Sequence, residues 1–483
     1  MAAAALAPLA LPVLRGNARA ATATLRPGGT PVSGGLQILA GSFHNHSTDS
    51  DGDAPPKAIA KWLYSNREAL GIDFAGLCDH ADFWPFTYRE PFGPSAWRKQ
   101  ARLADQYASL GFPFIRGFEY TSDEENHVSV LGASSYLKGM HFGDLTMSPL
   151  YRWLAGRDAI SIFNHPSAKG ALQWDDLAFA PAVADNFAAI EIGGQPSFDS
   201  ASLALSDAGW YWLALTRGWT VSPVMNWDMH HWRRIFRQTD VGLRGGDATT
   251  LPCQRTLVLA EAATPEAVEK ALAARRTSAT EHPSLWATLR GPGGIWQGGT
   301  VTSAGAGRTL SLTVEAGSTI WPLERIDIVS DNGVDPHAYY DGENSAHLRH
   351  AGPYARSYLE QHRRFAHSCG CSVRKAPIDG PPENTTVASV SLSGNHALRT
   401  VNVTIPSSPS LRPDGKRFFY AIVRAGQLRA WTAPIFTDDG TLRASAPRTP
   451  EPAKGAAAPS SSAAADALEP TPDVALGGAG AIP

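Results

Sequence analysis

Between residue 36 and about residue 285, short apolar runs alternate with stretches of helical periodicity. The apolar runs have roughly the 4–8 residues typical of buried strands, and several helical stretches begin near a proline, which suits a first helical turn. We expect strands at residues 36–43, 73–78, 113–120, 128–133, 159–163, 188–192, 220–226 and 255–260, and helices at residues 55–70, 94–110, 148–155, 200–216 and 265–275. This alternation predicts an α/β domain with a parallel barrel or a doubly wound sheet.

The pattern changes after about residue 286, where helical periodicity nearly disappears. β-like runs lie at residues 309–315, 326–330, 386–392, 400–405 and 418–425, with glycine and proline between them. This spacing favours a β-sandwich. A long polar insertion, residues 331–385, interrupts the pattern. Its histidines and cysteines show no periodicity, which is typical of solvated loop residues.

At 483 residues the chain is too long for one compact core, so we expect two domains and tails. The predicted segments are an export signal or linker at 1–35, an α/β domain at 36–285, a β-sandwich domain at 286–440 and a tail at 441–483. The tail is rich in Ala, Pro and Ser and has too little apolar surface to order itself, so we expect it to be disordered.

Composition and charge narrow the range of partners. A hydrophobic content of 43% and a charged content of 18% are those of a soluble globular protein. The net charge of −3 provides no basic field for nucleic acid, and no apolar run reaches the roughly 18 residues of a membrane span. The sequence leaves the oligomeric state open.

The N-terminal residues resemble part of an export signal. Residues 1–23 are rich in Ala, Leu and Pro and end in an Ala-Arg-Ala-Ala sequence, like a cleavage region, but the basic start of such a signal is missing. The segment is either a truncated export signal or a disordered leader. We favour export to an extracellular or periplasmic location, with a cytoplasmic location as the alternative, and four cysteines leave the compartment undecided.

The first candidate metal ligands are the pair His44-x-His46 at the end of the first predicted strand. Residues i and i+2 of a strand point to the same side, so both imidazoles would face one point, and Asp51 can return from the following turn. Imidazoles backed by a carboxylate are suitable ligands for a divalent ion. A single His-x-His pair is weak support, because the chain contains 15 histidines.

Similar residues recur near the ends or starts of several other predicted strands: His80, Glu119, His127, His165, Asp228 and His230. The carboxyl ends of strands in a parallel α/β barrel meet at one face, where active sites are built. With the first three, these would supply nine nitrogen and oxygen ligands, enough for two or three ions. Each could separately be a core histidine, a turn residue or a paired acid, but their regular placement at strand ends argues against that explanation for the set. We expect His141 and His231 to be structural.

Taken in order, these motifs resemble the motif series of the PHP (polymerase and histidinol phosphatase) superfamily, and most closely its CehA/McbA-type metallohydrolase branch. The series comprises His44-x-His46 with Asp51-Gly52, Asp79-His80, Glu119, His127, Asn164-His165-Pro166 and Asp228-x-His230. The resemblance covers residues 38–285 strongly and residues 286–440 loosely. It implies a distorted seven-stranded β/α barrel, here followed by the predicted C-terminal β-sandwich.

The resemblance also implies a centre of two or three divalent ions, of zinc, manganese or iron. By position, one ion would be held by His44, His46, Glu119 and Asp228, a second by Glu119, His127 and His165, and a third by Asp51, His80 and His230. The sequence departs from the pattern at Met225-Asn226-Trp227, where small residues are usual, and at Cys78, where threonine is common. Neither departure removes a ligand, but Trp227 could narrow the mouth of the site.

The mechanism we expect is metal-assisted hydrolysis, in which a hydroxide bridging two ions attacks an ester. Asp228 would accept a proton beside it, Glu119 would bridge the ions, and Arg255 with Arg275 or Arg276 could clamp a phosphate oxygen. A phosphoesterase acting on a small molecule is the first hypothesis. A carboxyl or carbamate ester hydrolase of the carbaryl-hydrolase type is the second. A non-catalytic surface-binding protein is the third.

Overall fold

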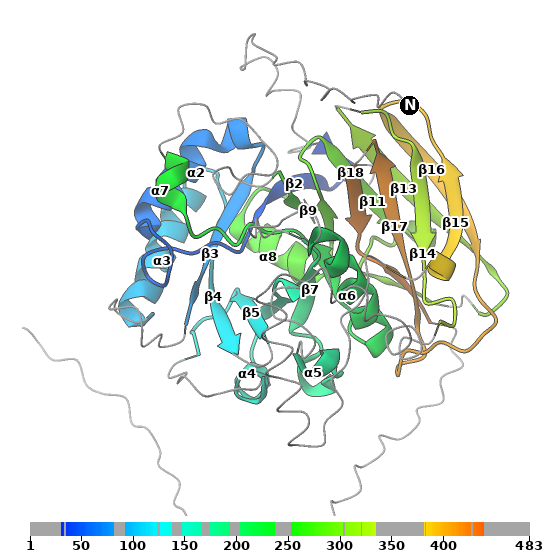
Figure 1. The fold of residues 1–483 in the computed structure, drawn as a ribbon, viewed down its shortest axis with the longest axis horizontal. Coiled ribbons are helices and arrows are strands. Elements are labelled where there is room, and N and C mark those ends of the chain that lie inside the picture. The colour runs from blue at the N-terminus through cyan, green and yellow to red at the C-terminus, as the bar shows by residue number, and fades with distance from the viewer. Residues whose placement is uncertain are drawn as a thin grey trace, which may run out of the picture. The chain divides into compact units, whose positions relative to one another are not determined.

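The computed structural model (Figure 1) describes residues 30–32, 35–81, 92–122, 126–137, 147–166, 174–193, 203–236, 253–302, 305–319, 321–334, 381, 383–426 and 428–438. The predicted export signal, most of the polar insertion 331–385 and the predicted tail lie outside these residues. The described residues belong to one compact unit. Within them, no helix is both long and apolar enough to cross a membrane.

The N-terminal half alternates strands and helices, as the hydrophobic pattern predicts. Its strands are β1 (Thr30–Pro31), β2 (Gln37–Ser42), β3 (Phe74–His80), β4 (Phe114–Ser122), β5 (Asn126–Leu131), β6 (Ile160–Phe163), β7 (Phe187–Glu191), β8 (Ser222–Val224), β9 (Arg255–Ala260) and β10 (Thr277–Thr280). Its helices are α2 (Pro56–Leu70), α3 (Pro94–Ala108), α4 (Ser148–Leu154), α5 (Trp174–Leu177), α6 (Leu203–Arg217), α7 (Trp232–Phe236) and α8 (Pro265–Ala273).

Local sequence signals set where these helices begin and end. Pro56 occupies the first turn of α2, where its missing N–H costs no hydrogen bond. Gly71 ends the helix in the left-handed region at a φ of 61°, which glycine adopts without strain. Thr264 caps α8, because its hydroxyl accepts a hydrogen bond from the Ala267 N–H at 3.2 Å.

The strands of this half lie in the order β9-β2-β3-β4-β5-β6-β7-β8. β2, β3 and β4 run parallel, and so do β6, β7 and β8. β5 is antiparallel to both of its neighbours and β9 is antiparallel to β2, so the sheet is mixed where the sequence predicted parallel strands. At the far end, the Thr277 hydroxyl of β10 donates to the Pro223 carbonyl oxygen of β8 at 2.9 Å.

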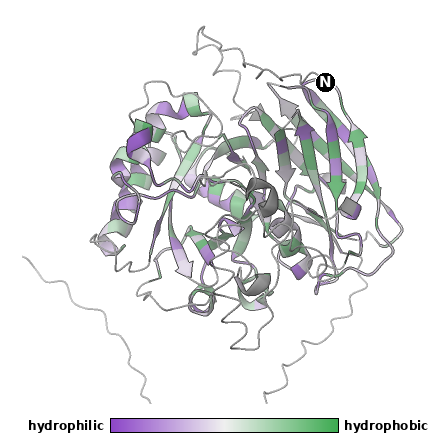
Figure 2. Ribbon diagram, in the orientation of Figure 1, coloured by the Kyte–Doolittle hydropathy of each residue, from purple (hydrophilic) through white to green (hydrophobic). Residues whose placement is uncertain are grey.

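Helices α2 and α3 cover part of this sheet with amphipathic faces. Ile59 and Leu63 of α2 and Leu103 of α3 are buried in one apolar cluster with Leu77 of β3 and Phe114 of β4. Figure 2 shows both hydrophilic (purple) and hydrophobic (green) residues along these helices. Burial of this apolar stripe fixes each helix against the sheet.

The C-terminal half is almost entirely β-structure. Its strands are β11 (Leu285–Arg290), β12 (Thr300–Thr302), β13 (Thr309–Ser318), β14 (Arg325–Val329), β15 (Thr386–Ser391), β16 (His396–Thr404), β17 (Arg417–Ala425), β18 (Leu428–Thr432) and β19 (Ile435–Asp438). β11, β13 and β16 form a three-stranded antiparallel sheet, and the others join the large sheet. Leu312, Val401 and Ile326 bring residues of both sheets into one buried cluster.

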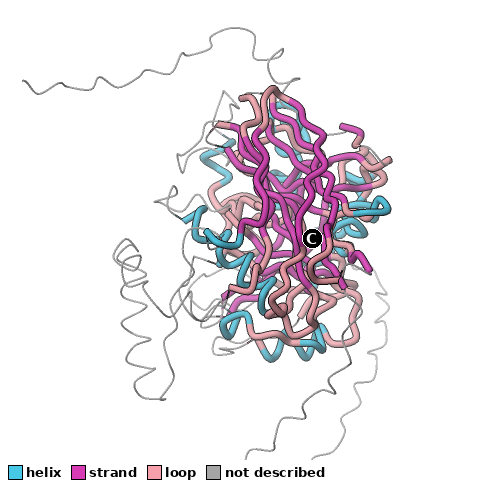
Figure 3. The backbone as a smooth tube through the Cα atoms, turned by 90° about the vertical axis from the view of Figure 1, so that its right-hand side faces the viewer, coloured by secondary structure: helices cyan, strands magenta, loops and turns pink. Residues whose placement is uncertain are grey.

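The two halves are joined by strand pairing and by a buried arginine. β10 pairs with β18 in antiparallel register, so the large sheet crosses the domain boundary predicted near residue 285. The Arg412 guanidinium donates to the carbonyl oxygens of Trp219 at 3.0 Å and Gly218 at 2.9 Å, at the end of α6. Seen from the side in Figure 3, strands fill the middle of the described part and helices flank them.

Candidate metal centre

Two loops bring the first ligand candidates together. The residues after β2 run beside the residues after β8, because Asp228 N–H donates to the His44 carbonyl oxygen at 2.9 Å and His46 N–H to that of Met229 at 3.0 Å. A parallel bridge joins Asn45 to Met229. These backbone contacts bring His44, His46 and Asp228 to one point, although they lie far apart in the sequence.

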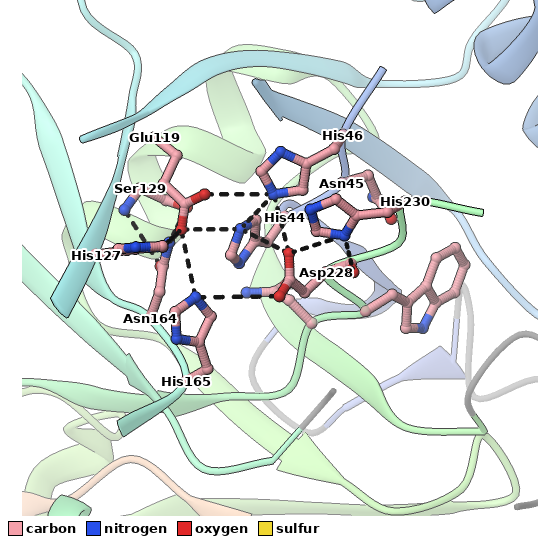
Figure 4. A network of polar contacts seen from close by, with 12 residues as sticks. His44, Asn45, His46, Glu119, His127, Ser129, Asn164, His165, Asp228 and His230 are labelled. Carbon is pink, nitrogen blue, oxygen red and sulfur yellow. Dashed lines mark hydrogen bonds and ion pairs between the residues drawn. The ribbon is translucent and has the colours of Figure 1, made fainter. Parts of the chain in front are cut away.

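At that point, imidazole and carboxylate atoms converge (Figure 4). Nε2 of His44 lies 3.0 Å from Nε2 of His46. Oδ1 of Asp228 lies 2.9 Å from the His46 nitrogen and 3.3 Å from the His44 nitrogen. Oε1 of Glu119, which lies within β4 opposite His80 at the end of β3, is 3.2 Å from His44 Nε2.

Glu119 continues the cluster toward three further histidines. Nδ1 of His127 lies 3.1 Å and Nε2 of His165 lies 3.4 Å from its Oε1, while Nδ1 of His80 lies 3.1 Å from its Oε2. His127 reaches this point because β5 is antiparallel: its first residues lie beside the last residues of β4. Nε2 of His46 lies 3.3 Å from the same Oε2, so the carboxylate lies between five imidazoles.

A more exposed group adjoins this buried one. Oδ2 of Asp51 lies 3.1 Å from Nε2 of His230 and 3.7 Å from Nε2 of His80, and its Oδ1 lies 3.5 Å from Nδ1 of His46. The Asp51 side chain is 43% exposed, whereas that of His46 is fully buried. The structure thus brings all nine predicted ligands together in two adjoining parts. The exposed half contains Asp51, His80 and His230, and the buried half contains His44, His46, Glu119, His127, His165 and Asp228.

The backbone is strained at two of these positions. His165 has a φ of 30° and Asp228 a φ of 48°, in the left-handed region that residues other than glycine seldom adopt. His165 N–H donates to Glu191 Oε2 at 2.7 Å, which holds this conformation. Strain of this kind concentrates at functional sites, where surrounding contacts enforce it.

Charges within the cluster shift the pKa of each group. Burial opposes ionisation of the carboxyls, but the neighbouring His44 and His80 hold the pKa of Glu119 well below its usual range, and His44 and His230 do the same for Asp228. Burial likewise opposes protonation of His230, but Asp228 and Asp51 raise its pKa to about 9. Burial and the charge of His230 lower the pKa of His46. Both buried carboxylates are therefore ionised at neutral pH.

Several buried polar residues that we did not predict as site residues support the cluster. Glu191, at the end of β7, accepts hydrogen bonds from His44 Nδ1 at 3.0 Å and from Asn226 Nδ2 at 2.9 Å. Asn164 donates to Glu119 Oε1 at 2.6 Å. Asp79 accepts a bond from Ser47 N–H at 2.6 Å. Glu191 is the last residue of an apolar strand, and that position was the one signal that could have identified it.

The donor atoms suit divalent ions. The nine residues form four overlapping groups, in each of which the donor atoms lie within 4.8 Å of one another. Among the described residues, Oε2 of Glu119 is buried and accepts no hydrogen bond, although His80 Nδ1 is 3.1 Å away. A buried carboxylate oxygen that faces nitrogens without hydrogen bonds is satisfied if a cation binds between them. Imidazole and carboxylate ligands fit Zn²⁺, Mn²⁺ or Fe²⁺.

The residues predicted to contact substrate do not join the cluster. The Arg255 guanidinium donates to the Leu70 carbonyl oxygen at 2.7 Å, at the end of α2. The Arg275 guanidinium donates to the Phe187 carbonyl oxygen at 3.3 Å, at the start of β7, whereas the cluster lies at the end of that strand. For Arg276, the described residues show no side-chain contact with the cluster. Trp227 is fully buried in the apolar cluster with α2, so it does not line a mouth.

No model of a known protein family matches the chain, and no curated protein sequence does. Among solved structures, a two-domain protein from Bacteroides vulgatus, described as containing a predicted PHP-like metal-dependent phosphoesterase, aligns with 85% of this chain and 99% of its own. The sequence identity is 15% and the TM-score is 0.41. At that degree of similarity, the assignment of function depends on this chain's own residues.

Proposed function

We propose that this protein is a metal-dependent hydrolase and, more specifically, a phosphoesterase that acts on a small molecule. The observation that carries the proposal is the convergence of four candidate metal-binding groups, three of which share His44 or Glu119. Structural metal sites usually close around a single ion. Overlapping groups that share ligands are instead the arrangement expected of a catalytic centre with two or three ions.

The residues have distinct roles in this proposal. Divalent ions bound here would acidify a water molecule and stabilise negative charge on the substrate. Glu119 lies between His44, His127 and His165 and can therefore serve two ions at once. Asp228 is ionised at neutral pH, because positive neighbours outweigh its burial, so it can accept a proton beside Nε2 of His46.

The order of the sequence motifs supports the same assignment. The series from His44 to His230 resembles that of the PHP superfamily and its CehA/McbA-type branch. The proposal also includes that family's distorted seven-stranded barrel, together with the C-terminal β-sandwich and the extracytoplasmic location that we predict from the sequence pattern.

A substrate panel on metal-loaded protein tests the proposal. We expect manganese- or zinc-loaded protein to hydrolyse p-nitrophenyl phosphate or bis-p-nitrophenyl phosphate, and the variant Glu119→Gln to lose that activity. His231→Gln is the matched control, because His231 is exposed and lies beside a ligand candidate without joining the cluster. Hydrolysis of 1-naphthyl esters alone would replace the phosphoesterase assignment with the carbaryl-hydrolase type. Protein that binds no metal and hydrolyses none of these would favour a binding protein.

A further inference from the structure

Glu191 is a buried carboxylate that is not itself a ligand candidate but forms hydrogen bonds with residues of the buried half. It accepts hydrogen bonds from His44 Nδ1 at 3.0 Å, from His165 N–H at 2.7 Å and from Asn226 Nδ2 at 2.9 Å. Because a carboxylate only accepts hydrogen bonds, His44 must donate through Nδ1. This bond directs Nε2 of His44 toward His46, Glu119 and the rest of the cluster.

Asp79 occupies the corresponding position behind the exposed half. It is fully buried in β3 and accepts from Ser47 N–H at 2.6 Å, Ser47 Oγ at 2.8 Å, Ser50 Oγ at 2.7 Å and Gln100 Nε2 at 2.9 Å. Three of these four bonds come from the loop of residues 47–52, which carries Asp51. No bond links Asp79 to a ligand side chain of the buried half among the described contacts.

A second contact fixes the same loop at its other end. A Cβ atom built on Gly52 would lie 2.5 Å from the His46 carbonyl oxygen and 2.7 Å from the Ser47 nitrogen, so only glycine allows this close approach. The neighbouring Asp53 N–H donates to the His230 carbonyl oxygen at 2.9 Å. The loop is therefore held on both sides of Asp51 before any ligand binds.

We propose that Glu191 and Asp79 are positioning residues that set the two halves of the centre separately. Glu191 orients His44 and His165 in the buried half, and Asp79 holds the loop that presents Asp51 to His80 and His230 in the exposed half. The inference rests on the proposed function in that both halves bind ions. Its new content is that the ion of the exposed half can be lost while the buried half stays loaded.

The test compares Asp79→Asn with Glu191→Gln, each in the full chain. Both substitutions remove one charge and keep the side-chain size, and Asp327→Asn is the control, because the buried Asp327 side chain accepts from Ser389 Oγ and Arg325 Nε in the C-terminal half and contacts no ligand candidate. Protein is loaded with Zn²⁺ alone and, separately, with Co²⁺ alone. The measurements are calorimetric titration, elemental analysis after gel filtration and the visible spectrum of bound Co²⁺.

For Asp79→Asn we expect the most weakly bound ion, that of the exposed half, to lose roughly 10–100-fold in affinity. The tighter ions of the buried half and their Co²⁺ bands should be unchanged. For Glu191→Gln we expect a loss of the same size at the tighter sites, with altered Co²⁺ bands. Ser47→Ala, which removes one of the bonds to Asp79, should give a smaller effect of the first kind and serves if Asp79→Asn does not fold.

Two outcomes would overturn the inference. An equal loss of metal affinity at all sites in both variants would show that the centre assembles as a single unit. Unchanged binding in both variants would show that neither carboxylate positions ligands. These results differ from failure of the proposed function, in which the unmodified protein itself would bind no Zn²⁺ or Co²⁺.

Discussion

At the scale of single residues, Glu119 has the largest influence on the site. Its two carboxylate oxygens face His44, His80, His127 and His165 at 3.1–3.4 Å, and no neighbouring carboxylate duplicates all these contacts. An amide at this position could neither balance the positive charges nor bridge two cations. Its replacement should therefore affect ion binding and catalysis together.

We expect Glu119→Gln to lose at least one equivalent of bound ion and to lower kcat/KM by about 100-fold or more. Elemental analysis and steady-state kinetics on the same preparation measure both effects. Glu261→Gln is the matched control, because Glu261 is an exposed residue paired with Lys270. Retention of full ion content by Glu119→Gln would contradict the central role of this carboxylate.

Gly52 allows a second residue-scale prediction. Alanine would place a Cβ atom 2.5 Å from the His46 carbonyl oxygen, so the loop must shift, at a cost of about 1–3 kcal/mol in the free energy of unfolding. Gly305→Ala is the control, since nothing lies within 4 Å of its added Cβ. Denaturant unfolding measures the difference, and equal stability of the two variants would refute the close approach.

Residue types at strand ends were predictable from the sequence, but the roles of individual side chains were only partly so. His44, Glu119 and Asp228 lie where the pattern placed them, because the carboxyl ends of parallel strands share one edge. Arg275 was misplaced, because closeness in sequence to the last strand does not tell which end of the sheet a side chain reaches. Glu191 was missed, because one acid after an apolar run is a common surface feature.

At the scale of elements, periodicity identified most helices and strands but not their directions. The runs at residues 36–43 and 73–78 became β2 and β3, and the stretch at 94–110 became α3. An apolar run looks the same in a parallel and an antiparallel strand. The direction of β5 therefore could not be predicted, although it decides how His127 reaches Glu119.

Arg412 tests how elements from the two halves hold each other. Its guanidinium satisfies carbonyl oxygens at the end of α6, and its side chain is fully buried there. We expect Arg412→Met to lower the free energy of unfolding by about 3 kcal/mol, measured by urea denaturation. The control Arg399→Met removes an exposed arginine that contacts its neighbour Leu398, and should change stability by less than about 0.5 kcal/mol.

The turn between β10 and β11 contains a pH-sensitive group. Burial and the nearby Arg255 lower the pKa of His282 to about 4, so the folded protein resists a proton that the unfolded chain accepts below about 6.5. Stability should therefore fall as pH drops from about 6.5 to 4, by on the order of 1 kcal/mol per pH unit from this residue. His282→Gln should flatten that part of the curve, measured by thermal unfolding between pH 4 and 7. A curve identical to that of the exposed-residue variant His396→Gln would contradict this prediction.

At the scale of the whole described unit, ion binding and folding should be coupled. The buried half brings together ionised carboxylates and imidazoles whose donor atoms lie about 3 Å apart. A bound cation would offset the cost of burying these charged and polar groups. A ligand that binds only the folded state adds about 2.7 kcal/mol at a free concentration of 100 times its Kd.

We therefore expect chelator-treated protein to unfold several degrees lower than metal-loaded protein, with recovery when Zn²⁺ or Mn²⁺ is restored. Differential scanning calorimetry measures the shift. Recovery with Mg²⁺ alone would argue against a site built from imidazoles, because Mg²⁺ prefers oxygen ligands.

The pairing of β10 with β18 restricts how this chain can be divided. A fragment that stopped near residue 285 would leave the N–H and C=O groups on one side of β10 without partners, and an open edge of that kind recruits strands from other molecules. Such a fragment would aggregate even though it contains every ligand candidate. The C-terminal half thus covers an edge of the sheet that bears the site, so the two halves should be produced and refolded together.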